Sequence, residues 1–260
     1  MKKKVGKSIG IFSGKGGVGK TTMTLNLAGI YESLGKKVLI MDMDLSSGNV
    51  SLALNKPASK TIYNFVDDYN NNRYKDFHDY ITPYDEKIDF LACPKDPRQA
   101  TKIDSKYVEL ALERAVTNYD LVLVDMSHFL NETNLVLLDS VSSILFVINN
   151  DPMDLKNVKS MISIFKDLQK ENYKILLYSA RDPFKEYFTL YDIKSILKAN
   201  IDYEITSEFY LKNIDSYVMN GKIVTLQEKA PNTFNKDYTT MVHLGIDLLG
   251  QEEVIENEEN

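Results

Sequence analysis

The segment from Gly14 to Thr21 has the composition and spacing of a phosphate-binding loop. It reads Gly-Lys-Gly-Gly-Val-Gly-Lys-Thr and matches the pattern G-x-x-x-x-G-K-[ST]. Because glycine has no Cβ, the backbone N–H groups of such a loop can approach phosphate oxygens closely. An apolar run at Ile9 to Ser13 precedes the loop and a helical pattern at Thr21 to Leu34 follows it, so a helix N-terminus would add its positive dipole end. The segment predicts a nucleotide phosphate site.

Three side chains of this region suit a bound magnesium nucleotide. We expect Lys20 to reach the β- and γ-phosphates, the Thr21 hydroxyl to bind Mg²⁺, and Thr22 to contact the α-phosphate. A glycine-rich turn without a ligand is the alternative, and the strand before the loop and the helix after it argue against that alternative. The other predicted nucleotide contacts come from the loop itself, at Gly14, Lys15, Gly16, Gly17, Val18 and Gly19.

Carboxylates follow two further apolar runs. Asp42 and Asp44 come at the end of the run that begins at Lys37, and Asp125 ends the run from Leu121 to Val124. Side chains two apart on an extended chain share a face, and the ligands of parallel sheets bind at the carboxyl ends of strands. A carboxylate there can orient an attacking water or hold Mg²⁺. Asp125 can also be a simple helix cap, but the phosphate loop upstream favours a magnesium role.

Short apolar runs alternate with longer amphipathic stretches along the chain. This alternation predicts an α/β, three-layer P-loop NTPase fold with a mostly parallel twisted sheet of about seven strands and helices on both faces. No internal repeat or Pro/Gly linker interrupts it, so we expect one domain at 1–250 and an acidic disordered tail at 251–260. The remaining strand runs are Ile88 to Ala92, Ser143 to Ile148, Tyr173 to Tyr178 and Ile201 to Ile205, and helical patterns include Ser105 to Val116, Leu155 to Leu168 and Leu190 to Lys198.

Charge and hydropathy exclude several classes of function. The net charge is -6, and five glutamates between Gln251 and Asn260 carry most of it, so the rest of the chain is close to neutral. Because nonspecific nucleic-acid binding depends on Lys and Arg, we expect no strong DNA binding. No segment approaches the roughly 20 apolar residues of a membrane span, and the first apolar run is too short for a signal peptide. The sequence predicts a cytoplasmic protein without a membrane-targeting helix.

Two features carry no predicted catalytic chemistry. Cys93 is the single cysteine, which excludes an internal disulfide and a four-thiolate metal site, and we expect a small buried residue near a strand end. The stretch from Asp67 to Tyr80 breaks the alternation and is rich in Asn, Asp and Tyr. It is either a surface excursion or a contact surface, since exposed tyrosines suit interfaces.

The lysine directly after the first loop glycine is a more specific feature. Lys15 begins the sequence Lys-Gly-Gly-Val-Gly-Lys-Thr-Thr, which resembles the deviant Walker motif of the ParA/MinD ATPases. The resemblance extends roughly from Lys7 to Gly250. It implies an ATPase that uses ATP and Mg²⁺ and forms a homodimer with ATP, in which Lys15 reaches the partner's nucleotide and acts as an arginine finger does. A solvated loop lysine is the alternative for Lys15.

The same resemblance implies roles for residues outside the loop. Asp44 corresponds to the hydrolytic carboxylate with Asp42 as its support, and Asp44 and Asp125 belong to the magnesium site. Asn49 lies five residues beyond Asp44 and matches an asparagine near the phosphates, with a simple turn residue as the alternative. Arg181 matches an arginine of the nucleotide site, although the adenine-reading asparagine that usually precedes it is replaced here.

Two segments indicate a branch of the family. The bulky stretch from Met126 to Leu130, followed by Asn150 to Asn157, is similar to the CpaE/TadZ proteins of type IV pilus assembly. This implies a spatial-organiser ATPase whose partners are protein components of a pilus or other polar machine. Alternatives are positioning of flagella or division as in FlhG or MinD, partitioning as in ParA, and a non-hydrolysing ATP-binding scaffold. Phe129 and Leu130 either dock a partner or fill the core.

Overall fold

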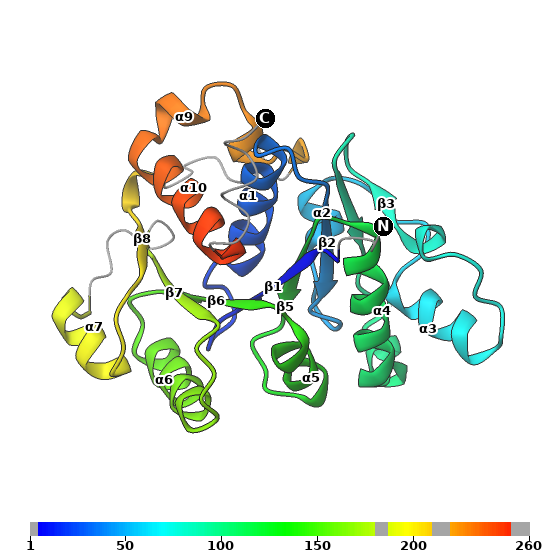
Figure 1. Ribbon diagram of the computed structural model, residues 1–260, viewed down its shortest axis with the longest axis horizontal. Coiled ribbons are helices and arrows are strands. Elements are labelled where there is room, and N and C mark those ends of the chain that lie inside the picture. The colour runs from blue at the N-terminus through cyan, green and yellow to red at the C-terminus, as the bar shows by residue number, and fades with distance from the viewer. Residues whose placement is uncertain (1–4, 180–186, 210–218, 251–260) are drawn as a thin grey trace.

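The structure is a computed structural model that describes residues 5–179, 187–209 and 219–250. Arg181 and the acidic segment 251–260 lie outside the described residues. A central sheet lies between two layers of helices, with α1 (Lys20–Ser33) and α10 (Asn235–Leu249) on one side and α4 (Ser105–Asn118), α5 (Glu132–Ser140) and α6 (Pro152–Asp167) on the other (Figure 1). The predicted three-layer α/β architecture is confirmed.

The described part of the chain forms an eight-stranded sheet in the order β3-β4-β2-β5-β1-β6-β7-β8. All neighbouring pairs are parallel except β3–β4, which is antiparallel and forms one edge. The sequence predicted about seven strands, and β3 is the additional one because two residues ending in a proline carry no apolar pattern. The strands are β1 (Lys7–Phe12), β2 (Val38–Met43), β3 (Thr82–Pro83), β4 (Ile88–Leu91), β5 (Leu121–Met126), β6 (Ser143–Ile148), β7 (Tyr173–Tyr178) and β8 (Tyr203–Ile205).

The remaining helices are shorter and lie mostly around the sheet's rim. Only some of them were expected, because α2 and α9 are single turns and the end of α3 overlaps the stretch where the apolar alternation breaks. The α-helices are α2 (Val50–Ala53), α3 (Ile62–Asn70), α7 (Leu190–Leu197) and α9 (Ala230–Thr233), and the 3-10 turns are η1 (Phe77–Tyr80), η2 (Pro97–Lys102), η4 (Ser207–Phe209) and η5 (Val224–Leu226).

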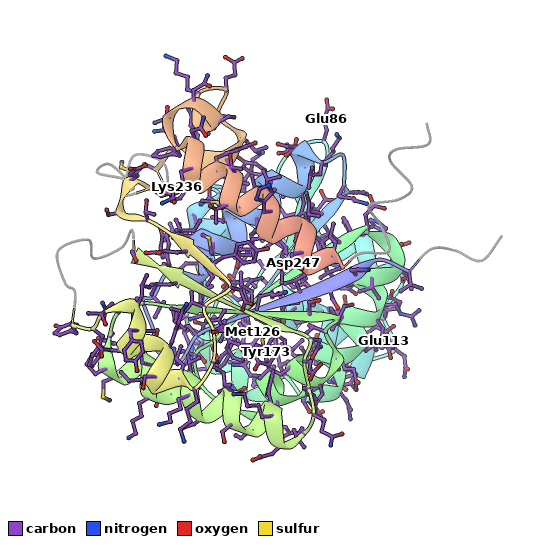
Figure 2. The ribbon with its side chains drawn as sticks, turned by 60° about the vertical axis from the view of Figure 1, so that its left-hand side comes forward. Glu86, Glu113, Met126, Tyr173, Lys236 and Asp247 are labelled. Carbon is purple, nitrogen blue, oxygen red and sulfur yellow. The ribbon has the colours of Figure 1, made fainter. Side chains whose placement is uncertain are left out.

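Apolar side chains form two cores, one on each face of the sheet. On one face α1 and α10 pack over side chains such as Ile9 and Ile40, and on the other α3 to α7 pack over side chains such as Met41 and Val124. The two middle strands β2 and β5 are buried along their whole length, which is why they read as continuous apolar runs. In Figure 2 Met126 lies in the interior, whereas Glu86 extends outward into solvent.

Strand register places the chemical residues at one edge of the sheet. Asp42 on β2 pairs with Asp125 on β5, and Asp125 in turn pairs with Ile11 on β1. The glycine-rich loop leaves β1 one residue after Phe12. The phosphate loop and both carboxylate-bearing strand ends therefore meet at the carboxyl edge, where parallel α/β sheets bind their ligands.

The stretch from Asp67 to Tyr80 is an excursion whose aromatic rings pack inward. Tyr80 is fully buried, and Tyr69 and Tyr74 are half-buried against the core beside Phe65. The interpretation as a surface of exposed tyrosines is therefore wrong.

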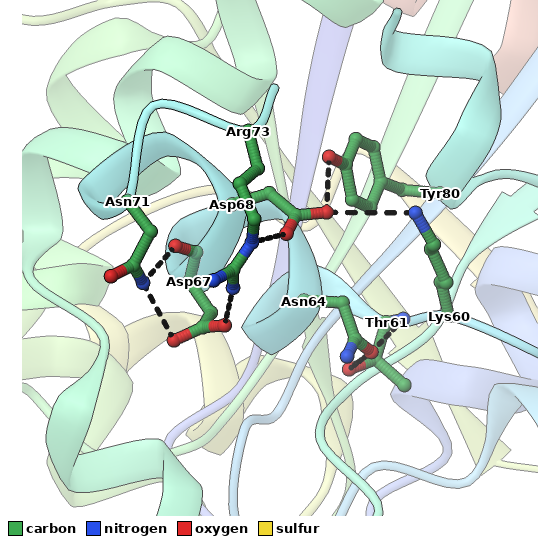
Figure 3. A network of polar contacts seen from close by, with 8 residues as sticks. All are labelled: Lys60, Thr61, Asn64, Asp67, Asp68, Asn71, Arg73 and Tyr80. Carbon is green, nitrogen blue, oxygen red and sulfur yellow. Dashed lines mark hydrogen bonds and ion pairs between the residues drawn. The ribbon is translucent and has the colours of Figure 1, made fainter. Parts of the chain in front are cut away.

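A polar network at Asp68 explains this inward packing (Figure 3). Its carboxylate accepts hydrogen bonds from the Tyr80 hydroxyl (2.8 Å) and from Arg73 Nε (3.0 Å), and Lys60 lies 3.5 Å away. These donors, Arg73 first, hold the pKa of Asp68 below its usual range. The tyrosine hydroxyl is thus satisfied at the core boundary, so its ring can be buried at low cost.

Candidate nucleotide and magnesium site

The glycine-rich loop wraps one end of a cavity of about 400 Å³. The cavity is lined by glycines of the loop, by Lys20, Thr21 and Thr22 at the start of α1, and by Asp44 and Asp125. The predicted phosphate-loop side chains and two of the three predicted carboxylates are therefore brought together. Gly17 and Gly19 have φ values of 79° and 118°, which only glycine adopts without strain, and this curvature turns the loop into α1.

Lys20 is buried and points along the loop. Its Nζ donates a hydrogen bond to Ser13 Oγ at 3.1 Å, and Ser13 Oγ donates to the Lys15 carbonyl at 2.7 Å. Burial lowers the pKa of the Lys20 ammonium, and the nearby carboxylates of Asp125 and Asp44 oppose that effect. A cation held in a partly desolvated, anion-lined cavity suits a phosphate ligand, because the charge interaction is screened less than in water.

Thr21 and Asp125 lie together although 104 residues separate them. Thr21 Oγ1 donates to one oxygen of the Asp125 carboxylate at 2.6 Å, and Thr24 Oγ1 is 3.4 Å from the other oxygen. Burial raises the pKa of Asp125 to about 6, against the lowering effect of the Thr21 hydrogen bond and of Lys20. A hydroxyl and a desolvated carboxylate at a strand end are hard oxygen donors of the kind that Mg²⁺ takes.

The donor set fits magnesium better than a metal enclosed by protein ligands. Among the residues that the structure describes, no group of three or more His, Cys, Asp or Glu side chains gathers to hold a metal ion. Mg²⁺ is usually held by one or two protein groups, with waters and substrate phosphates completing its octahedron. Thr21 and Asp125 would hold the ion, with Asp44 facing the same cavity, and the ion would supply positive charge against the phosphates.

Asp42 and Asp44 have different surroundings. Asp44 lines the cavity, and its Oδ1 accepts a hydrogen bond from Ser47 Oγ at 2.9 Å. Asp42 is buried and does not line the cavity, and its Oδ2 accepts from the Val50 backbone N–H at 3.0 Å. Burial and the neighbouring Asp125 raise the pKa of Asp42 well above its usual range. Asp42 therefore closes the loop that presents Asp44.

Asn49 faces the cavity from that same loop. Its Nδ2 donates to the Ser47 carbonyl at 2.7 Å, and it precedes α2 without a capping hydrogen bond from its side chain. The described contacts are those of a turn residue, and its place in the cavity wall also leaves the amide beside the phosphate site.

Lys15 points out of the loop and is held by the N-terminus of α6. Its Nζ lies 2.7 Å from Asp151 Oδ2. The same helix holds the first loop glycine, because Asn157 Nδ2 donates to the Gly14 carbonyl at 2.7 Å. A Cβ on Gly14 would lie 2.7 Å from the Cβ of Asn157, so only glycine fits against this helix. The α6 contacts could not be predicted from the sequence, because they bring together residues far apart in the chain.

A second cavity of about 520 Å³ adjoins the first, and Gly16 and Gly17 line both. Its walls come from the ends of β6, β7 and β8 and from the start of α7, so a nucleotide with phosphates in the first cavity would place its base here. Asn150 fixes one wall through two hydrogen bonds with the Phe188 backbone, at 2.8 and 3.0 Å. The sequence predicted no nucleotide-site role for Asn150 or Phe188. Arg181, which it did name, lies outside the described residues.

His128 is a further residue of the phosphate cavity that the sequence analysis left without a role. Its imidazole ring faces Gly16, and a Cβ added there would lie 3.3 Å from Cε1. Burial, then the positive charge of Lys20, lowers the pKa of His128, while Asp44 opposes this. The sequence feature that could have identified His128 is its position three residues after Asp125, in the segment that follows the strand.

Comparisons with known proteins agree with this geometry. Residues 6–177 match the family model described as "AAA domain". The chromosome-partitioning ATPase Soj of Thermus thermophilus is 25% identical over 206 residues, which cover 78% of this chain and 77% of that protein. The crystal structure of a ParA family ATPase from Chlorobium tepidum TLS superposes with a TM-score of 0.78 at 16% identity, covering 94% of this chain and 98% of that one.

The septum site-determining protein MinD from Pyrococcus horikoshii OT3, solved with Mg-ADP, gives a TM-score of 0.77 at 20% identity, covering 98% and 99% of the two chains. The site and the matched family together define a P-loop ATPase. The chain belongs to the AAA domain family, and the proteins named above that it is similar to are ParA- and MinD-type proteins. It is an ATPase, and its Thr21 and Asp125 side chains offer the oxygen donors that Mg²⁺ takes beside a nucleotide. Within the described ranges, no helix combines the length and apolar character needed to cross a membrane.

Proposed function

We propose that this protein is a positioning ATPase that dimerises with ATP and docks a protein partner through the segment after Asp125. The observation that supports this proposal most directly is that two large apolar side chains are exposed there. The exposed fraction is 63% for Phe129 and 49% for Leu130. Of the two interpretations drawn from the sequence, core filling is therefore wrong for both. In P-loop switches this region responds to the γ-phosphate, so a surface on it can report the nucleotide state to a partner.

The segment is held in a defined shape rather than left as a loose loop. Asn134 on α5 is fully buried, and its Nδ2 donates to the Ser127 carbonyl (3.0 Å), to Ser127 Oγ (2.8 Å) and to the Phe129 carbonyl (2.7 Å). Leu135, which follows Asn134 on α5, is also half exposed. A preorganised apolar patch beside the nucleotide is a suitable docking site, since large apolar anchors carry much of an interface's binding energy.

Dimer formation rests on Lys15. Its side chain is at the mouth of the cavities and about half exposed, so it is accessible to a second copy. We propose that it reaches the partner's nucleotide, and that Asp44 orients the attacking water with Asp42 behind it. Slow turnover would suit a switch, in which the lifetime of the ATP form sets how long a location is marked.

The machine that we propose is a type IV, Tad-like pilus assembly. Support comes from the similarity of the Met126 to Leu130 segment, and of the Asn150 to Asn157 segment after it, to CpaE/TadZ proteins. Flagellar or division placement, chromosome partitioning and a non-hydrolysing scaffold remain the other candidates. Turnover of ATP by purified protein excludes the scaffold.

The test uses a deletion strain and a fluorescent fusion. Loss of pili with normal flagella, and a focus at the pilus site, supports the proposal. Normal pili with altered flagellar number, or defective segregation with both appendages intact, would overturn the pilus assignment.

Variants of the surface itself test the docking step. Phe129→Ser with Leu130→Ser is expected to abolish the focus, and Leu130→Ser alone, which leaves the Phe129 ring in place, should weaken the focus while ATP binding is retained. Leu168→Ser serves as the matched control, because Leu168 is equally exposed (59%) at the far end of α6 and should leave the focus intact. A focus that persists without Phe129 and Leu130 would contradict docking at this segment.

A further inference from the structure

His128 lies in the wall of the phosphate cavity with groups that act on the terminal phosphate. The cavity lining includes Lys20, expected at the β- and γ-phosphates, and Asp44, expected at the attacking water. The His128 ring reaches the loop itself: a Cβ on Gly16 would lie 3.3, 3.5 and 3.7 Å from Cε1, Nδ1 and Nε2. Both ring nitrogens are therefore close to the glycine loop.

Both chain neighbours of His128 help to hold its ring in position. The buried Asn134 amide holds the backbone of Ser127 and of Phe129, the two residues that flank His128. The Phe129 ring packs on the imidazole with centroids 3.9 Å apart. Side chains locked by second contacts of this kind are typical of groups that must meet a ligand in one geometry.

An imidazole donates at least one N–H in every protonation state, so it can always hydrogen-bond a phosphate oxygen. The pKa of His128 lies below its ordinary value because of burial and Lys20, so one nitrogen also keeps a free lone pair near neutral pH and can accept from water. A side chain that combines both functions is suited to the place where a water approaches a phosphate.

We propose that His128 contacts the γ-phosphate end of bound ATP and distinguishes the triphosphate from the diphosphate. The contact lies on the same segment as Phe129 and Leu130, so loss of the γ-phosphate would release the backbone that carries the docking surface. This inference rests on the proposed function only in that last link, since nucleotide discrimination is a property of the isolated chain.

The experiment compares nucleotide affinities of purified protein by calorimetry, with Mg²⁺ present and AMP-PNP as the non-hydrolysed triphosphate. His128→Ala is expected to weaken AMP-PNP binding about tenfold, as for loss of one hydrogen bond to a charged group, and ADP binding less than about twofold. His128→Gln, which keeps an N–H donor, should recover part of the AMP-PNP affinity. Leu135→Ala is the control, because it changes the same region outside the cavity and should alter neither affinity.

The outcomes separate this inference from the proposed function. Selective loss of AMP-PNP affinity with partial recovery in His128→Gln supports it, whatever machine the protein serves in cells. Equal weakening of both nucleotides, or unchanged affinity for both, would overturn it while leaving the ATPase assignment intact. Wild-type protein that binds neither nucleotide would overturn both.

Discussion

Lys15 Nζ and Asp151 Oδ2 lie 2.7 Å apart within one chain, although 136 residues separate them in the sequence. Asp151 has a second task, because its Oδ1 accepts from the backbone N–H groups of Met153 (2.9 Å) and Asp154 (3.1 Å) and so caps α6. One carboxylate thus holds both a helix and the lysine proposed to cross to a second copy. The lysine has to leave this pair before it can act in trans.

Asp151→Asn is expected to favour the ATP dimer. Asparagine is as good a helix cap as aspartate, so the substitution removes the charge pair and keeps the helix start. Since the pair is partly exposed, its loss should release no more than about 1 kcal/mol per protomer, or about 2 kcal/mol per symmetric dimer, which corresponds to an up to about thirtyfold lower dimer dissociation constant. Sedimentation of the variant with ATP, in an Asp44→Ala background that blocks turnover, measures the dimer dissociation constant.

Lys15→Ala should weaken the dimer, and a normal dimer with normal turnover in Lys15→Ala would refute the trans role.

Lys20→Ala and Asp44→Ala should separate binding from turnover. Lys20 is the buried cation of the phosphate cavity, so its loss is expected to abolish ATP binding. Asp44 lines the same cavity and is expected at the attacking water, so its loss should leave binding nearly unchanged and reduce turnover by at least about a hundredfold, as for other general-base groups. Calorimetry and phosphate release measure the two properties. Tight ATP binding by Lys20→Ala would contradict the site assignment.

Gly48 and Asp42 should be energetically coupled. A Cβ on Gly48 would lie 2.2 Å from Asp42 Oδ1, so Gly48→Ala has to displace the loop that carries Asp44. We expect Gly48→Ala to lower both the melting temperature and kcat. Asp42→Ala removes the clash, so the double variant should lose less stability than the sum of the single variants, by about 0.5–3 kcal/mol. Thermal unfolding of the four proteins gives the coupling, and strict additivity would show that the two residues do not meet.

Stability should fall as pH rises through the range in which Asp154 ionises. Burial raises the pKa of Asp154 from 3.8 to about 7 in the folded protein, against hydrogen bonds from the N–H groups of Asn149 and Gly14. Below the unfolded value both states hold the proton, and above the folded value neither does. Between them the native state binds more protons than the unfolded chain, so this group's contribution is fully present at low pH and is lost toward pH 7.

Asp154→Asn isolates this effect because the amide cannot ionise. Over that window the variant should lose stability less steeply than the wild type, by up to about 1.4 kcal/mol per pH unit. Urea unfolding at pH 5, 6 and 7 measures both slopes. Burial also raises the pKa values of Asp42 and Asp125, which remain in both proteins and cancel in the comparison. Parallel slopes would show that Asp154 is not the titrating group.

Much of the phosphate site could be predicted from the sequence because its geometry is local. The glycines lie in one loop between β1 and α1, and Lys20 and Thr21 are the first residues of α1, so their spacing alone defines the shape. Asp44 and Asp125 could be placed near it because parallel strands present their carboxyl ends at one edge. The edge strand β3 and the base pocket could not be predicted, since the first has no pattern and the second is assembled from four elements.

The sequence by itself determined the fold class and the phosphate loop, because buried parallel strands read as continuous apolar runs and a phosphate cradle requires glycines at fixed positions. Only the tertiary structure decided which side chains face outward and which distant groups meet. Tyr80 is buried because Asp68 satisfies its hydroxyl, whereas Phe129 and Leu130 are exposed on a segment whose Phe129 carbonyl is fixed by Asn134. The contacts of Lys15 with Asp151 and of His128 with Gly16 follow from the packing of α6 and β5 beside the loop, and no short-range pattern encodes packing between segments that are far apart in the chain.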